Sequence, residues 1–447
     1  MLDFDLQTLA EITNGKLVGE NPGFQTVSID SRAILERCLF IPIKGERFDG
    51  QDFIEAAFDN NAIAALTEKP IKTQKPYVLV ENTRLALGLL AAAQRQRFKK
   101  PVLGLTGSLG KTTTKALIAA ILRQKHEVLS PEVSMNNDIG LPLTLLDMAD
   151  QDFAVIEMGT NHFGEIPYLA NITKPDVALI TNIGAAHLEH FKDLAGVAKE
   201  KSAIFAGLAR NGTAVVNADD LYSEGFKKAI GSRKTISFGY CKTADVRAEN
   251  IKLNELGQAS FQLVTVKYFG EINLQCYGEH NVKNALAAVA AASLYDIPFE
   301  DVKTGLESVQ AVTKRLMRRP GLNGSTIIDD SYSAIPEAVT AALKVLACAK
   351  GKKIFVFGGM AELNKKDAIS IHEKIGRQAQ ELGVDELIVI GDLAKHTAGT
   401  FGMAKQFDNK QELITYTKTL LADDVTILVK GSRGMRLEEV VAKLVRV

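Results

Sequence analysis

The most informative residues form a glycine-rich segment, Thr106-Gly107-Ser108-Leu109-Gly110-Lys111-Thr112-Thr113. Glycines allow backbone N–H groups to close around phosphate oxygens, and a helix that starts after them adds positive potential. The lysine can reach the β- and γ-phosphates, and the first threonine hydroxyl can ligate Mg²⁺. The spacing is the shorter GxxGKT form, because the full motif would need glycine at Leu105. The segment predicts an ATP site, with the Lys111 ammonium solvated while no nucleotide is bound.

Two further residues follow buried strands that we expect beside this loop. Glu157 ends the apolar run Ala154–Met158, and His187 comes shortly after the run Val177–Thr181. The carboxyl ends of parallel strands meet at one edge of a sheet, so both side chains are expected near the phosphates. Carboxylate oxygens are ligands that Mg²⁺ prefers. Glu157 is therefore a predicted magnesium ligand, while for His187 a ligand role and a structural role remain equally open.

The last third of the chain has its own strand-end charges. Asp329-Asp330 closes one predicted strand, and Lys430-Gly431-Ser432-Arg433 closes another. A second strand-end carboxylate suggests a nucleotide held in a cleft between domains, and the cations could clamp a carboxylate or phosphate. Ordinary surface charge is the alternative for both. Thr173-Lys174-Pro175-Asp176 matches a guanine-reading pattern, but it precedes its strand instead of following one, and we attribute it to chance.

The elements that must position these residues indicate an α/β fold. Short apolar runs rich in Val and Ile predict strands covered on both faces. In the central region the predicted strands are Val102–Thr106, Ala154–Met158, Val177–Thr181, Thr213–Asn217 and Thr235–Phe238, with helices at Thr114–Arg123 and Asn281–Leu294 and an antiparallel stretch at Val246–Tyr277. Before them we expect strands at Thr26–Ile29 and Leu39–Ile43 and helices at Gln51–Asn60 and Thr83–Phe98. After Arg315 the predicted strands are Ile327–Asp329, Ile354–Phe357, Leu387–Ile390 and Thr426–Val429.

This pattern predicts three domains. They are a small mixed α/β N-terminal domain over residues 1–82, a central P-loop parallel α/β domain over 83–313, and a C-terminal Rossmann-like domain over 314–447. The length of 447 residues agrees with about three domains.

Composition excludes several classes of protein. The chain has 53 lysines and arginines and 53 aspartates and glutamates, so its formal net charge is zero. The basic surplus of a nucleic-acid-binding protein is therefore absent. The longest small-apolar run, Ala285–Leu294, is too short to span a membrane. The acidic start has no signal-peptide pattern, and the four scattered cysteines predict free thiols in a reducing compartment. We expect a cytoplasmic protein without membrane insertion or nucleic-acid partner.

The ordered motifs resemble the Mur ligase family over nearly the whole chain. The resemblance is strongest to the branch that adds a D-alanyl-D-alanine dipeptide to UDP-N-acetylmuramoyl-tripeptide. The matching strings, besides the phosphate loop, are Asp30-Ser31-Arg32, Phe48-Asp49-Gly50, Asn136-Asn137-Asp138-Ile139-Gly140-Leu141-Pro142, Ile156-Glu157-Met158-Gly159, residues 198–205 (AKEKSAIF), Gly278-Glu279-His280-Asn281, Arg315-Leu316, Asp329-Asp330-Ser331-Tyr332 and Lys430-Gly431-Ser432-Arg433.

The resemblance implies an ATP- and Mg²⁺-dependent amide ligase of peptidoglycan synthesis that acts through an acyl phosphate. We expect it to work as a monomer on small-molecule substrates. The implied catalytic and metal contacts are Lys111, Thr112, Glu157, His187 and Lys201, the last as a carbamate. The implied ATP contacts are Gly107, Ser108, Leu109, Gly110, Lys111, Thr112, Thr113, Asn281, Arg315 and Asp330. The implied substrate contacts are Ser31, Arg32, Phe48, Asp49, Asn137 and Arg433. Without the resemblance, Lys201 would be an ordinary solvated helix lysine.

The sequence also departs from the family pattern and leaves alternatives open. Leu109, Lys314, Ser333, Ile335 and Gly359 stand where the family usually has other residues, which puts details of nucleotide and acceptor contact in doubt. A ligase adding a single amino acid is one alternative, although the DNPR signature of the diaminopimelate-adding member is absent and the nearest string is Asp408-Asn409-Lys410-Gln411. A catalytically idle nucleotide-binding regulator is another. A nicotinamide oxidoreductase ranks low, because no GxGxxG follows a leading strand.

Overall fold

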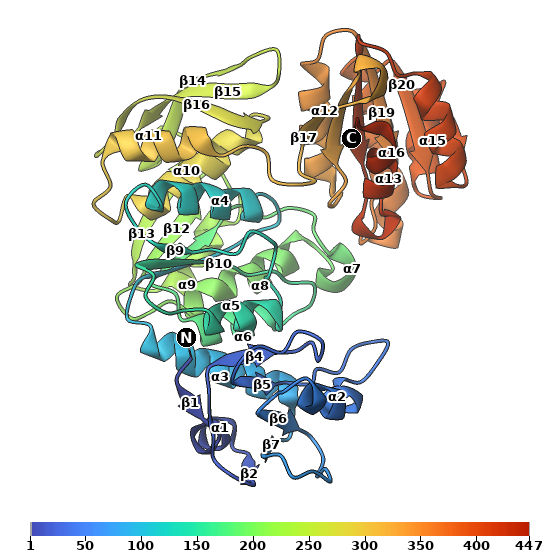
Figure 1. Cartoon of the computed structure of the whole chain (residues 1–447). Coiled ribbons are helices and arrows are strands. Elements are labelled where there is room, and N and C mark those ends of the chain that lie inside the picture. Colours follow the sequence, from blue (N-terminus) through green and yellow to red (C-terminus); the bar gives the residue numbers. More distant parts are fainter. Residues whose placement is uncertain (1, 447) are drawn as a thin grey trace.

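A computed structural model describes residues 2–446, and its strands form three large sheets that follow one another along the chain (Figure 1). The first sheet has five strands, the second nine and the third six, and a two-stranded ribbon lies near the N-terminus. Helices connect many of the consecutive strands in these sheets. The predicted α/β class with three domains is confirmed, and the C-terminal sheet lies at the opposite end of the molecule from the N-terminal one (Figure 1).

The N-terminal sheet has the order β2-β7-β6-β5-β4. These strands are Lys16–Val18, Tyr77–Leu79, Ala64–Thr67, Cys38–Phe40 and Thr26–Ser28. The ribbon pairs β1 (Phe4–Asp5) with β3 (Gly23–Phe24), and the helices are α1 (Leu6–Thr13) and α2 (Ile54–Asp59), the latter preceded by a 3-10 turn over Gly50–Phe53. The predicted strand Leu39–Ile43 ends earlier than expected, at Phe40. The Ile41 N–H still donates to the Ser28 carbonyl at 2.9 Å, but Pro42 cannot donate a ladder hydrogen bond.

Helix α3 (Thr83–Arg97) leads into the central sheet, and the Asn82 side chain accepts a hydrogen bond from the Leu85 N–H at its start. The central order is β16-β15-β14-β13-β12-β11-β8-β10-β9. In chain order these strands are β8 (Val102–Thr106), β9 (Val128–Leu129), β10 (Phe153–Glu157), β11 (Val177–Ile180), β12 (Thr213–Asn217), β13 (Lys234–Gly239), β14 (Val246–Leu253), β15 (Gln258–Val264) and β16 (Phe269–Tyr277).

Side chains of the central strands alternate between two cores. Val102 belongs to a core with α3, α5 (Gly140–Leu146), α6 (Glu165–Thr173) and α8 (Leu194–Ala206). Leu103 and Leu105 belong to a core with α4 (Lys111–Leu122), α10 (His280–Ala292) and α11 (Phe299–Ser308). Burial on both faces explains the continuous apolar runs in the sequence. β14 pairs parallel with β13, and β15 and β16 then follow antiparallel in the same sheet, which confirms the antiparallel stretch expected at Val246–Tyr277.

The C-terminal sheet has the order β17-β18-β22-β19-β20-β21, and β17 is its antiparallel strand. The strands are β17 (Met317–Pro320), β18 (Thr326–Asp330), β19 (Lys352–Phe357), β20 (Glu386–Ile390), β21 (Lys405–Phe407) and β22 (Val425–Lys430). Its helices are α12 (Pro336–Ala347), α13 (Lys365–Glu381), α14 (Ala394–Phe401), α15 (Lys410–Thr419) and α16 (Glu438–Leu444). The sequence pattern missed β17 and β21, because both are short, polar edge strands without an apolar run.

Candidate active site

The phosphate loop joins the end of β8 to the start of α4. Gly110 has φ +79° and caps the helix, and a Cβ on Gly107 would lie 1.8 Å from the Thr181 hydroxyl oxygen. The Asn182 side chain accepts a hydrogen bond from the Leu109 N–H at 2.9 Å. Both glycines are thus required by the packing of this loop. The helix starts at Lys111 and not at Thr114 as expected, because the three threonines carry little apolar periodicity although their backbone is helical.

Lys111 was expected to be solvated, but it does not lie in solvent. Its side chain is partly buried, and its Nζ donates a hydrogen bond to the Gly107 carbonyl oxygen at 2.8 Å. Burial lowers the pKa of Lys111, while the Glu157 carboxylate opposes this and Arg315 adds to it. The ammonium therefore occupies the loop itself, where it would exchange one carbonyl oxygen for phosphate oxygens.

Glu157 ends β10 and is only 4% exposed. Its Oε1 accepts a hydrogen bond from the Asn136 side-chain amide at 2.8 Å, whereas its Oε2 has no hydrogen-bond partner within residues 2–446. A buried carboxylate oxygen without a partner is costly, so a ligand at this atom would remove the cost. The Thr112 hydroxyl, 3% exposed at the start of α4, offers a second oxygen. This donor set fits Mg²⁺, which prefers hard oxygen ligands.

Two residues beside Glu157 were missed by the sequence analysis. Asn136 lies next to the predicted Asn137, and Lys115 lies one helical turn after Lys111 on the same face of α4. Lys115 is 3% exposed, its Nζ donates to the Pro131 carbonyl at 2.5 Å, and it lies 4.0 Å from Glu157 Oε2. The repeated lysine at i+4 was the available signal. Asn137 itself accepts a hydrogen bond from the Gly140 N–H at 2.8 Å at the start of α5.

His187 lies at the N-terminus of the short helix α7 (Leu188–Phe191) with φ +52°. Its Nδ1 is 2.7 Å from Oε2 of Glu362, a residue of the loop that follows β19 in the C-terminal sheet. This hydrogen bond lowers the pKa of Glu362. Within residues 2–446, no three His, Cys, Asp or Glu side chains converge on a metal-binding group. His187 and Glu157 instead line one cavity of about 400 Å³ together with Lys111 and Glu362.

Lys201 is buried, contrary to the solvated lysine that its sequence context alone would predict. It lies on α8 and is 1% exposed. Burial, with a contribution from the positive charge of Lys111, holds the pKa of Lys201 well below its usual range. Glu200, its neighbour, accepts hydrogen bonds from the N–H groups of Gly164 and Ile166. The Lys201 amine therefore has an enlarged neutral fraction, which is the form that reacts with carbon dioxide.

Three predicted nucleotide contacts line a second cavity of about 410 Å³ beside the phosphate loop. Asn281, on α10, is held by a hydrogen bond from its Nδ2 to the Tyr277 carbonyl at 2.7 Å. The Arg315 guanidinium lies 4.3 Å from the centre of the Tyr332 ring. Asp330 accepts a hydrogen bond from the Leu316 N–H at 3.1 Å with one carboxylate oxygen. The central and C-terminal sheets thus both contribute to this cavity, as the strand-end charges suggested.

The other oxygen of Asp330 accepts a hydrogen bond from Lys430 Nζ at 2.5 Å, between neighbouring strands β18 and β22. Lys430 and Asp330 are 2% and 8% exposed, so Lys430→Met would leave a buried charge without its partner. We expect a loss of about 3–5 kcal/mol in the free energy of unfolding of the C-terminal domain, measured by urea denaturation. Lys350→Met is the matched control, because its pair with Glu255 is exposed and such pairs contribute about 0–1 kcal/mol. Equal stability of the two variants would contradict this interpretation.

The predicted substrate contacts of the N-terminal domain lie apart from both cavities. Ser31 is 9% exposed, whereas Phe48 is 64% exposed. Arg32 forms an ion pair with Asp30, and Asp49 accepts a hydrogen bond from the Gln51 N–H. A link to the central domain comes from Arg84, which donates to Asp138 at 3.0 Å and to the Lys44 carbonyl at 3.4 Å. Arg433, by contrast, lines the 400 Å³ cavity with Lys111. The structure therefore separates the predicted substrate contacts into two groups.

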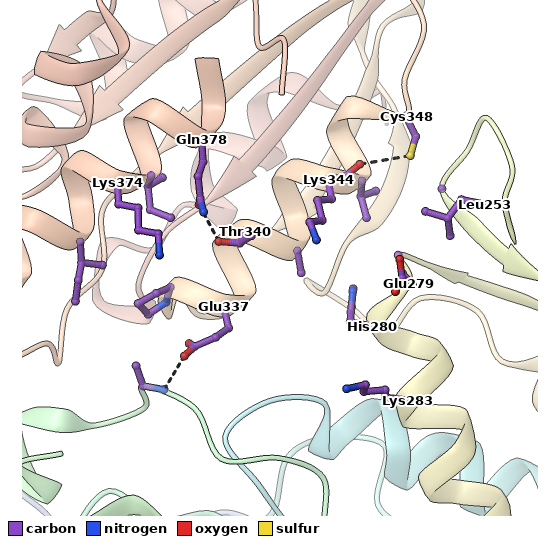
Figure 2. A pocket seen from close by; sticks show the side chains of 18 of the residues that line it. Leu253, Glu279, His280, Lys283, Glu337, Thr340, Lys344, Cys348, Lys374 and Gln378 are labelled. Carbon is purple, nitrogen blue, oxygen red and sulfur yellow. Dashed lines mark hydrogen bonds between the residues drawn. The ribbon is translucent and has the colours of Figure 1, made fainter. Parts of the chain in front are cut away.

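A cleft between the central and C-terminal domains extends beyond the 410 Å³ cavity. Figure 2 shows a hollow of about 700 Å³ between α12 and α13 on one side and the start of α10 on the other. Glu337 crosses it, with its Oε1 accepting a hydrogen bond from the Ala185 N–H at 3.2 Å (Figure 2). His280 and Lys283 line both spaces. The cleft lies between two domains, so rotation of the C-terminal domain would change its width.

Two expectations from composition can be compared with the structure. No helix within residues 2–446 is long and apolar enough to cross a membrane. The four cysteines, all among the described residues, are free thiols.

Models of three protein domains match the chain in order. They are the "Mur ligase family, catalytic domain" at residues 24–95, the "Mur ligase middle domain" at 105–292 and the "Mur ligase, glutamate ligase domain" at 314–433. The middle-domain match contains the phosphate loop, Glu157, His187 and Lys201. The chain belongs to the Mur ligase family.

Curated relatives of this Mur ligase match it over its whole length. It is 40% identical to the UDP-N-acetylmuramoyl-tripeptide–D-alanyl-D-alanine ligase of Escherichia coli, over 99% of each chain. It is 33% identical to the protein of the same name from Bacillus subtilis, over 100% of this chain and 99% of the relative. The resemblance inferred from the sequence motifs is confirmed.

Solved structures agree with these relatives. A crystal structure of MurF from Acinetobacter baumannii superposes with a TM-score of 0.93 at 33% identity, covering 99% of this chain and 98% of that one. The MurF ligase of Thermotoga maritima in complex with ADP gives a TM-score of 0.82 at 28% identity, covering 94% and 96%. The nicotinamide oxidoreductase considered above is not favoured, because the fold, the motifs and the named relatives all point to a ligase.

Proposed function

We propose that this Mur ligase joins D-alanyl-D-alanine to UDP-N-acetylmuramoyl-tripeptide at the expense of ATP, to form the pentapeptide precursor of peptidoglycan. The full-length match to ligases of that name carries the proposal. The phosphate loop, the Glu157 oxygen that has no hydrogen-bond partner within residues 2–446, and the adjacent 410 Å³ cavity support it.

The chemistry follows from a poor leaving group. A carboxylate does not acylate an amine at neutral pH, because oxide or hydroxide would have to leave. Attack of the tripeptide carboxylate on the γ-phosphorus of ATP releases ADP and gives an acyl phosphate. The dipeptide amine then attacks the acyl carbon, and phosphate leaves as the amide forms and a proton is lost. The contribution of the protein is mainly positioning and charge neutralisation.

The residues divide these tasks between the two cavities. Lys111 neutralises the phosphates, and Asn281, Arg315 and Asp330 surround the nucleotide. Magnesium would be held by the Thr112 hydroxyl and by Glu157, with His187 and the carbamate of Lys201 completing the metal ligands, and it would supply charge neutralisation for the phosphoryl group. Arg433 and Asn137 line the 400 Å³ cavity, where the dipeptide amine and the acyl group would meet.

The division of the chain into domains is part of the proposal. Residues 1–82 would bind the UDP end through Ser31, Arg32, Phe48 and Asp49, residues 83–313 would bind ATP, and residues 314–447 would hold the dipeptide and complete the nucleotide site. Three substrates on three domains imply domain closure during turnover. We further propose a monomer that works in the cytoplasm, where UDP-linked precursors and ATP are available.

The deciding experiment is phosphate release under complete and incomplete substrate sets. We expect phosphate to appear only when ATP, UDP-N-acetylmuramoyl-tripeptide and D-alanyl-D-alanine are all present, and a single amino acid not to replace the dipeptide. Turnover with a single amino acid would instead identify a ligase of another branch. Nucleotide binding without any phosphate release would favour the idle regulator.

A further inference from the structure

The imidazole of His187 is oriented by a residue of the other domain. Its Nδ1 lies 2.7 Å from Glu362 Oε2, and its ring meets Phe191 edge-to-face, with 6.4 Å between the ring centres. A histidine whose Nδ1 is engaged by a carboxylate has only Nε2 left to bind a ligand. Metal-binding histidines commonly have this arrangement, and the carboxylate fixes both the tautomer and the ring direction.

The segment that carries Glu362 is docked onto α7 by more than this one contact. The Glu189 N–H donates to the Glu362 carbonyl oxygen at 3.3 Å, and the Asn364 side chain donates to the Lys192 carbonyl at 2.7 Å. Glu362 has φ +66°, and Lys192 has φ +72°. A positive φ is uncommon for non-glycine residues and costs conformational energy, which the surrounding contacts must offset. Contacts at both ends of α7 therefore hold the Glu362 carboxylate against His187.

We infer that Glu362 is a positioning residue for the metal site: it holds His187 with Nε2 available to the metal, so that docking of the C-terminal domain completes this ligand. The inference rests on the proposed function, since it takes His187 as a magnesium ligand. It assigns the C-terminal domain a role in metal binding in addition to its substrate contacts. The shared cavity of His187, Glu362, Glu157 and Lys111 supports it.

The test measures metal binding without turnover. Full-length enzyme with a non-hydrolysable ATP analogue is titrated with Mn²⁺, and free Mn²⁺ is followed by electron paramagnetic resonance. Loss of an outer carboxylate on a metal-binding histidine weakens affinity by about 10–100-fold, and we expect Glu362→Ala to lie in this range. Glu362→Gln should lose less, because the amide oxygen can still accept the Nδ1 proton.

Asn364→Ala is the matched control, since it removes a neighbouring hydrogen bond across the same contact and leaves His187 untouched. Glu189→Gln controls for removal of one negative charge from α7. We expect both to bind Mn²⁺ within about twofold of the wild type. Unchanged affinity in Glu362→Ala would overturn the inference, and so would an equal loss in Asn364→Ala, which would mean that docking alone matters. Failure of the proposed function would appear separately, as absence of phosphate release by the wild type.

Discussion

Lys111→Ala is expected to lower kcat/KM by about 10³-fold, with phosphate release as the measurement. The lysine belongs to the phosphate loop and would lie beside the transferred phosphoryl group, and its charge matters most in the transition state of the transfer. The fold should survive, because the ammonium contributes one hydrogen bond, to the Gly107 carbonyl, from a site that disfavours its charged form. Thermal unfolding within a few degrees of the wild type would establish this.

Lys374→Ala provides the control for Lys111→Ala. Lys374 is an exposed lysine that lines the 700 Å³ hollow and not the phosphate loop (Figure 2). We expect the Lys374→Ala enzyme to turn over at about the wild-type rate. This control separates the effect of losing any positive charge from the effect of losing the charge in the phosphate loop. A Lys111→Ala enzyme with near-normal turnover would mean that this loop is not the ATP site.

The second large effect is expected at Lys201. An ammonium cannot ligate Mg²⁺, because it has three donors and no lone pair. The neutral amine can attack carbon dioxide to form a carbamate with loss of one proton, and the product carries a hard oxygen ligand. Burial and the nearby charge of Lys111 favour the neutral amine, and hence this reaction. Lys201→Ala should therefore lose about 10³-fold in turnover, a loss of the size found when a charge-stabilising group is removed.

Three comparisons distinguish the carbamate from a merely structural lysine. Added acetate or formate should partly restore Lys201→Ala by supplying carboxylate oxygens, and depletion of carbon dioxide should slow the wild type. Lys201→Arg should be inactive, since it places a permanent cation in a site 1% exposed beside Lys111. Lys199→Ala is the matched control, an exposed lysine two residues earlier on α8. Wild-type turnover by Lys201→Arg would rule the carbamate out.

The sequence determined those features that depend on neighbours along the chain. The phosphate loop was recognisable because its glycines, lysine and threonine are consecutive, and the strand ends at Glu157 and Asp330 because apolar runs precede them. The α/β class followed from the spacing of those runs. Element boundaries were less certain, as at Thr114 against Lys111, since hydrogen bonding and not hydrophobicity sets where a helix begins.

Tertiary structure decided what depends on segments far apart in the chain. No sequence pattern near Lys201 indicates that its side chain is buried, because burial depends on which helices and strands pack around α8. The partners Asn136 for Glu157 and Glu362 for His187 lie 21 and 175 residues away, and local spacing carries no information about such pairs. The free oxygen of Glu157 likewise appears only when every neighbouring donor is in place. The sequence thus specified the chemical groups, whereas folding specified their protonation, their orientation and the atoms left open for ligands.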